Sequence, residues 1–244
     1  MSQIFFLSLI SFFASLIDTA LGMCYGTLMV PFLLIFDYSP QISVGAVLFS
    51  QLIVDILGSI THAKVKNLKK EDLKHAFIVS FPATIFVIGG AFLNIHLPEK
   101  ITRVYTGIIV LLLGLLIMMR IKFKKTARRL IFISSMAGFN KGFIGGGFGP
   151  IIVPGQILLN HNPRSSVAIG DLAEIPVCLV GLLTLIFLGE MKFSSLFLII
   201  SFPAAIASFI GPLFTKKISH SNLEKIVAFL SIFEGIAILI RSFS

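Results

Sequence analysis

The chain has 244 residues, of which 56% are hydrophobic and only 13% are charged, with a mean hydropathy of +1.00. Soluble domains are ~45 to 50% apolar, so this composition excludes a water-soluble globular protein and indicates an all-α polytopic membrane protein. The net charge of +9 arises from lysines and arginines in short loops between apolar runs. That is the positive-inside pattern of membrane proteins, so the lipid bilayer, and no nucleic acid, is the expected partner.

Polar loops divide the chain into eight apolar segments, each near the ~20 residues that a bilayer-spanning helix needs. The first and the fifth are longer than the rest and are interrupted by glycine and proline. In chain order the segments cover residues 4–36, 42–62, 75–95, 102–119, 130–159, 166–188, 194–213 and 223–240.

An internal duplication relates the two halves of the chain. With a constant offset of 123 residues, residues 14–69 fall on residues 137–192 without a gap. Identical residues then coincide at Gly22 and Gly145, Gly26 and Gly149, Val30-Pro31 and Val153-Pro154, Pro40 and Pro163, and Ser43-Val44 and Ser166-Val167. We therefore expect two units of four hydrophobic segments each, residues 1–122 and 123–244.

The basic loops predict how these units lie in the membrane. Residues 62–75, 120–129 and 215–225 are rich in lysine and arginine and should face the cytoplasm. The fifth segment then begins and ends on the cytoplasmic side, so it must be broken or re-entrant, and the first segment likewise begins and ends outside. The two units are thus predicted to be inverted repeats, with both termini outside, an arrangement found in secondary transporters.

The stretch FNKGFIGGGFGPIIVP at 139–154 contains five glycines, two prolines and Lys141. Non-helical backbone is tolerated at membrane depth only where it is buried in protein or lines a water-filled cavity. Glycines allow a sharp turn that exposes backbone N–H groups, and a helix that starts there directs its positive dipole end at the same place. Because Lys141 adds a full positive charge, this loop is predicted to bind an anion.

GFNKGFIGGGFGPIIVP in the second half and LIDTALGMCYGTLMVP in the first, within the duplicated frame, resemble the TauE/SafE family, also called the sulfite exporter or TSUP family. The resemblance covers essentially the whole chain. It implies a permease of the bacterial inner membrane for small, sulfur-containing anions such as sulfite or sulfonates. The first-half copy has Asp18 in place of Lys141, and Met23 and Cys24 in place of Gly146 and Gly147, so the second-half loop is the better candidate for the anion.

The predicted site combines a substrate loop with polar residues of the neighbouring segments. The substrate-binding candidates are Asn140, Lys141, Gly142, Gly145, Gly146, Gly147, Gly149, Gly22 and Gly26. The coupling or gating candidates are Asp18, Gln51, Asp171 and Glu174. The hinge candidates are Pro82 and Pro203, although a static kink is the commoner effect of a proline within a helix.

Several of these roles have alternatives. Glu174, the repeat partner of Gln51, either forms a structural ion pair with Lys141 or carries a coupling proton. Asp18 either bridges to Lys141 or caps a half-helix N-terminus. Asp171 is expected to be a cap or gate residue rather than a ligand. Asp55 either snorkels, takes part in helix packing or has a functional role.

Two other function classes stay open. A thiol-redox carrier would use Cys24 and Cys178, but the offset pairs these residues with Gly147 and Asp55, so the thiols are not symmetry mates. An intramembrane enzyme would use the glycine loop as an oxyanion site, but no catalytic or metal-ligand spacing supports it, and the five histidines lie at segment ends or in loops. We expect a transporter without enzymatic activity, cofactor or metal, with protons as the candidate coupling ion.

Overall fold

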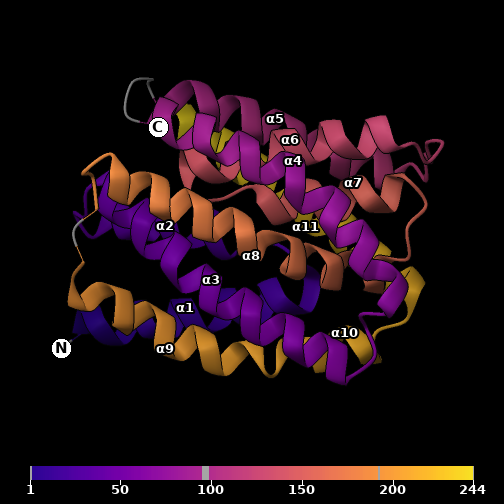
Figure 1. The fold of residues 1–244 in the computed structure, drawn as a ribbon, viewed down its shortest axis with the longest axis horizontal. Helices are drawn as coiled ribbons and strands as arrows, with labels where there is room; N and C mark the ends of the chain where they lie inside the picture. Colours follow the sequence, from indigo (N-terminus) through magenta and orange to yellow (C-terminus); the bar gives the residue numbers. More distant parts are fainter. Residues whose placement is uncertain (1, 95–98, 192, 244) are drawn as a thin grey trace.

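The computed structural model describes residues 2–94, 99–191 and 193–243, and within them the chain forms eleven α-helices and no strand. The predicted end of the third segment, residue 95, lies outside these ranges. The helices are α1 (Ser2–Leu21), α2 (Tyr25–Ile35), α3 (Pro40–Lys64), α4 (Lys70–Asn94), α5 (Glu99–Met118), α6 (Ala127–Ile144), α7 (Phe148–Leu158), α8 (Pro163–Phe187), α9 (Ser195–Ser208), α10 (Gly211–Lys217) and α11 (His220–Phe243). They lie roughly along one direction in a single bundle (Figure 1).

The outer surface of the bundle is suited to lipid. Phe77 of α4, Phe202 of α9 and Phe229 of α11 are 67%, 73% and 64% exposed, which is costly in water and favourable in a bilayer. Five helical stretches are long and apolar enough to span a membrane. They are Gln3–Leu21, Gln41–Lys64, Lys70–Asn94, Pro163–Phe187 and Ser195–Lys217. The protein is therefore a multi-pass membrane protein.

Local signals in the sequence explain where the central helices start. Pro40 and Pro163 stand in the first turns of α3 and α8, where a missing N–H costs nothing. The preceding residues act as N-caps: Ser39 Oγ accepts a hydrogen bond from Ile42 N, and Asn162 Oδ1 accepts from the first amides of α8.

The backbone repeats at the offset seen in the sequence. The bounds of α2 and α7 differ by 123 residues at both ends, and so do those of α3 and α8. Positive φ angles recur at the same spacing: Gly22 (78°) and Gly145 (71°), Cys24 (99°) and Gly147 (80°), Asp37 (63°) and Asn160 (62°), and Lys66 (64°) and Gly189 (73°). Because such angles are rare outside glycine, these coincidences show that residues 22–66 and 145–189 follow the same local backbone path.

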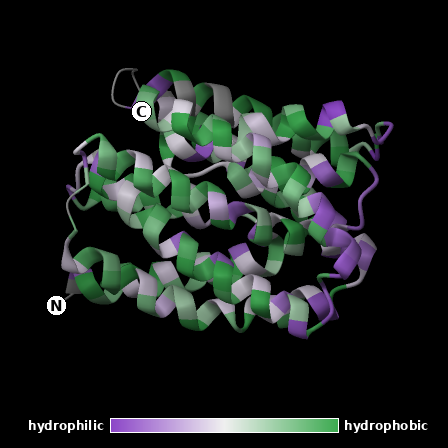
Figure 2. Ribbon diagram, in the orientation of Figure 1, coloured by the Kyte–Doolittle hydropathy of each residue, from purple (hydrophilic) through white to green (hydrophobic). Residues whose placement is uncertain are grey.

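The two ends of the bundle differ in polarity. In Figure 1, α1 begins and α11 ends at the left, while the α3–α4, α5–α6 and α10–α11 connections lie at the right. Figure 2 shows hydrophilic residues gathered at that right-hand end and mostly apolar ribbon elsewhere. The basic loops identified in the sequence are thus on one side of the molecule.

Candidate functional site

The two glycine-containing breaks, at residues 22–24 between α1 and α2 and at residues 145–147 between α6 and α7, touch through bare backbone. A Cβ added to Gly26 would clash with the carbonyl oxygen of Gly145 and lie 2.7 Å from Cα of Gly146. A Cβ added to Gly149 would clash with the carbonyl oxygen of Gly22. Only glycine permits this approach, so the sequence brings the starts of α2 and α7 together.

A small cavity lies between the breaks. Its walls are the start of α2 and the start of α7, closed by side chains from α1, α3, α6 and α8. It is lined by Asp18, Cys24, Tyr25, Gly26, Thr27, Gln51, Lys141, Gly146, Gly147, Phe148, Gly149, Pro150 and Glu174. The free space suffices for about one water molecule, so the site is closed in this structure and must widen to take a larger ligand.

Most of the residues singled out in the sequence meet at this cavity, and the others have separate contacts. Gly22 and Gly145 hold the turns with positive φ. Gly142 packs against the backbone of α4, with Val87 O and Ala91 N at the position that a Cβ would take. Asn140 is fully buried, and within the described chain neither atom of its amide has a hydrogen-bond partner.

Lys141 forms a buried ion pair across the cavity. Its Nζ lies 2.6 Å from Glu174 Oε1, and the two side chains are only 2% and 8% exposed. The structural ion pair expected for Glu174 is therefore present. Each charge compensates the other in this buried place, where an isolated ammonium or carboxylate would have a large desolvation cost.

Asp18 does not bridge to Lys141, which was one of the two expectations for it. Its Oδ1 accepts a hydrogen bond from the amide of Tyr25, the first residue of α2, at 3.3 Å, and its Oδ2 accepts one from Gln51 Nε2 at 2.7 Å. The capping alternative is thus confirmed. Gln51 Nε2 also donates to Asp55 Oδ1 at 2.7 Å, so one amide joins two carboxylates.

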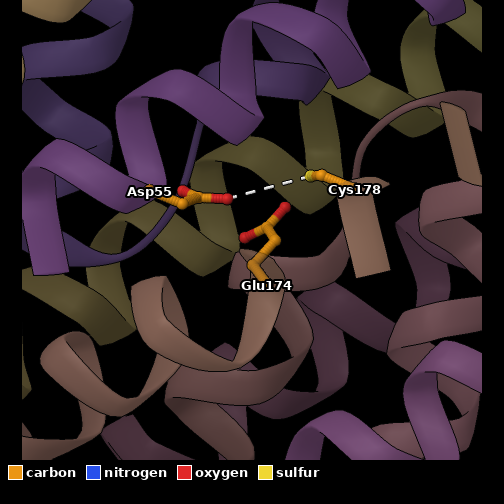
Figure 3. Close-up of side chains that lie close together, drawn as sticks. All are labelled: Asp55, Glu174 and Cys178. Carbon is orange, nitrogen blue, oxygen red and sulfur yellow. Dashed lines mark hydrogen bonds between the residues drawn. The ribbon is translucent and has the colours of Figure 1, made fainter. Parts of the chain in front are cut away.

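Asp55 is completely buried, so the snorkelling alternative for it is wrong. Figure 3 shows Asp55, Glu174 and Cys178 pointing toward one another, with Cys178 Sγ 3.8 Å from Asp55 Oδ2. Their ligand atoms lie within 4.8 Å of one another, close enough to surround a metal ion. However, the Lys141 ammonium already neutralises Glu174, and a cation at this place would be repelled by it.

The two half-helix N-termini differ in charge. The N-terminus of α2 has the Asp18 carboxylate at its first amide, whereas the N-terminus of α7 begins at Gly147 without any side-chain cap. Helix N-termini attract negative charge. The start of α2 already has an anion from the protein, and the start of α7 has open amides beside Lys141.

Two residues that were not among the candidates predicted from the sequence belong to buried polar networks. Glu234 of α11 is 6% exposed and accepts a hydrogen bond from Thr27 Oγ1, which lines the cavity. Its position inside the last apolar segment was a signal, because an ionisable residue at membrane depth is functional by default.

The other is His62, which is fully buried. Its Nε2 lies 3.0 Å from Thr19 O and 3.4 Å from Asp171 Oδ2, and its Nδ1 lies 2.9 Å from Asn67 Nδ2. Asn67 donates, so Nδ1 accepts and Nε2 carries the hydrogen, the neutral tautomer. Asp171 thus contacts a histidine away from the cavity, which the sequence did not indicate.

The two proline candidates lie within helices. α4 continues through Pro82 and α9 through Pro203. The interruption in the seventh segment falls at residues 209–210, after Pro203. A hinge role for either proline stays a prediction.

Comparison with known proteins agrees with this architecture. The family model described as Sulfite exporter TauE/SafE matches residues 7–238. A curated relative, "Probable membrane transporter protein YtnM" of Bacillus subtilis (strain 168), is 29% identical over 192 residues, which is 72% of this chain and 62% of the relative. No solved structure is significantly similar. With a match across nearly its entire length, the chain belongs to the sulfite exporter TauE/SafE family of membrane transporters.

Proposed function

We propose that the protein is a secondary transporter that moves small anions, most favourably sulfur oxyanions such as sulfite or sulfonates, across the bacterial inner membrane. The two halves, residues 1–122 and 123–244, would act as inverted repeats that expose the central cavity alternately to the two sides.

The observation that carries the proposal is the positive charge beside the second-repeat break, residues 145–147; the break at residues 22–24 is the first-repeat break. The uncapped N-terminus of α7 and the Lys141 ammonium both border the cavity. Backbone amides at a helix N-terminus together with a lysine form the usual setting for an oxyanion. The Asp18 carboxylate at the start of α2 disfavours an anion there.

Reciprocal packing supports the inverted repeats. A Cβ at Gly22 would meet Val153 Cγ2 at 2.5 Å, and a Cβ at Gly145 would meet Val30 Cγ2 at 3.0 Å. Because Gly22 pairs with Gly145 and Val30 with Val153 at the 123-residue offset, each contact is the mate of the other, as expected about a two-fold axis. The equivalent α3–α4 and α8–α9 connections lie at opposite ends of the bundle (Figure 1).

The ion pair between Lys141 and Glu174 suggests how binding leads to opening. An entering anion competes with Glu174 for the lysine, so the ion pair must open when the site is filled, and Glu174 is one candidate for the coupling proton. Gln51 and Asp18, which tie α3 to the start of α2, would respond to that change, and Asp171 would act at its contact with His62. Proton coupling through such a buried carboxylate is part of the proposal.

Ligand-induced stabilisation of the detergent-purified protein tests this function. The unfolding temperature is measured with sulfite, thiosulfate, sulfoacetate, taurine, sulfate and acetate. We expect sulfur oxyanions to raise it progressively with concentration. Lys141→Met should weaken binding by about 10-fold to 100-fold, the loss expected for a hydrogen bond to a charged group.

Controls separate binding from folding. Lys141→Met leaves Glu174 unpaired, so Lys141→Met/Glu174→Gln, which removes both charges, restores the fold without restoring binding. Lys122→Met removes a partly exposed lysine that pairs with Glu224. We expect this variant protein to bind the anion normally. Undiminished binding in the double variant would exclude Lys141 from the site, and lack of stabilisation by any of these anions would argue against the substrate class.

A further inference from the structure

Glu234 lies against the first-repeat break, the one at residues 22–24. It comes from α11, which lies outside the two broken segments, and reaches the first turn of α2. Its Oε1 contacts the hydroxyl of Thr27, and its Oε2 lies 3.9 Å from Cys24 Sγ. Both Thr27 and Cys24 line the anion cavity, so only one layer of side chains separates the carboxyl group from it.

The hydrogen bonds to Glu234 bring it no compensating positive charge. They are donated by two uncharged groups, the Thr27 hydroxyl and the Cys24 thiol. The residue is only 6% exposed, and a buried carboxylate without a cation is costly, so such a group takes up a proton. The burial of Glu234 therefore favours the protonated acid.

The charges around Glu234 favour the same state. Within the described chain, no lysine, arginine or histidine lies within ion-pair distance of it, in contrast to Glu174. Asp18 of α1 disfavours a second negative charge here, whereas the Cys24 thiol donates to Glu234 Oε2 as an uncharged group and supplies no positive charge. Of the other helices packed on α11, α7 has no ionisable residue. α8 carries Asp171, Glu174 and Cys178, and in its first turn Arg164, whose guanidinium donates to Ile218 O. The ionisable residues of α5 all precede Gly107, which packs against Leu239 of α11.

We propose that Glu234 is the proton-binding site that is coupled to anion binding in the cavity. This inference rests on the proposed function and assigns the second-repeat break to the anion and the first-repeat break, through Thr27, to the proton. An anion that enters the cavity meets the negative charge of Asp18 on the α2 side, and an ionised Glu234 would add to it. Anion and proton therefore bind cooperatively, and each raises the affinity for the other.

The cycle requires no covalent step. A proton from water binds Glu234 while the cavity is open to the more acidic side, the anion binds beside Lys141, and both leave to water on the more alkaline side. After the anion and the proton have left, Glu234 is ionised and repels Asp18. This repulsion lasts until the cavity closes or Glu234 binds another proton.

Binding of two anions, sulfite and methanesulfonate, tests the coupling in detergent-purified full-length protein. Methanesulfonate is included because its own charge does not change with pH. For the wild type, we expect the Kd of methanesulfonate to fall from alkaline to acidic pH by a factor of about 5 to 150, the usual range for coupled sites. Glu234→Gln imitates the protonated acid, so it should bind tightly at both pH values. Glu234→Asp should retain the pH dependence, and so should Glu224→Gln, a matched change at a more exposed glutamate of the same helix.

An infrared measurement tests the proton directly and needs no anion. The carbonyl stretch of a buried carboxylic acid should be present in the wild type near neutral pH and reduced in Glu234→Gln but not in Glu224→Gln. An unchanged band would overturn the proposal, and so would a pH dependence of binding that survives in Glu234→Gln. If neither anion binds, the anion class under the proposed function fails, and the infrared result alone decides whether Glu234 holds the proton.

Discussion

At the residue scale, the glycines of the two breaks are required for different physical reasons. Gly145 and Gly147 have positive φ angles, so a side chain there is strained. Gly26 has an ordinary helical position but faces the backbone of Gly145 and Gly146. Its role is close approach, which the glycine pattern of the sequence alone does not distinguish from a turn.

Gly26→Ala should therefore destabilise the protein by about 1–3 kcal/mol, the usual cost of overpacking, because its Cβ would meet immovable backbone. The unfolding midpoint in detergent measures this. Gly89→Ala is the matched control, since nothing lies within 4 Å of the position of its Cβ, and it should be tolerated. Equal stability of the two variants would mean that the breaks are not in contact.

A second residue-scale prediction concerns His62, which joins α1, α3 and α8 through Thr19, Asn67 and Asp171. His62→Leu leaves these groups with fewer partners in a buried place, and each unsatisfied group costs about 1–3 kcal/mol. We expect a clear loss of thermal stability, while His220→Leu, at an exposed position, has little effect. Recovery of stability in His62→Leu/Asp171→Leu would assign the loss to Asp171, and additive losses would show that the two residues act independently.

At the element scale, hydrophobic segments and breaks were predictable because their causes are local. Apolar run length set the helices, and glycine and proline clusters marked the interruptions within residues 4–36 and 130–159, which became α1 with α2 and α6 with α7. The division of the seventh segment into α9 and α10 was not predicted. The residue after the break, Gly211, packs against Thr19 of α1, a tertiary contact that no local pattern reports.

The side-chain partners inside the site were less predictable than the elements that carry them. Repeat symmetry pointed to Asp18 as well as Glu174 as a partner for Lys141, but symmetry does not say which carboxylate lies nearer. Asp18 is held at the start of α2 by the amide of Tyr25, leaving the lysine to Glu174. The contact between Thr27 and Glu234 joins residues 207 positions apart, so it depends on the packing of the whole chain.

At the scale of the whole molecule, charge distribution and backbone path lead to the same orientation. The hydrophilic connections lie at one end of the bundle (Figure 2), and the positive-inside rule predicts that this end faces the cytoplasm. Ser194, in the α8–α9 connection, and Ser221, at the start of α11, are both exposed and lie at opposite ends (Figure 1). They provide a matched pair of positions for testing the orientation.

Single cysteines are introduced as Ser194→Cys or Ser221→Cys into a background in which Cys24→Gly and Cys178→Ala remove the native thiols. Glycine suits the φ of 99° at position 24, as it does at Gly147 in the other half. With a membrane-impermeant maleimide on intact spheroplasts, we expect Ser194→Cys to react and Ser221→Cys to react only after permeabilisation. The reverse pattern would show that the molecule has the opposite orientation in the membrane. Labelling of both cysteines from outside would contradict the placement of positions 194 and 221 at opposite ends of the bundle. Because this background has no native cysteine, full activity in it would also exclude the thiol-redox carrier.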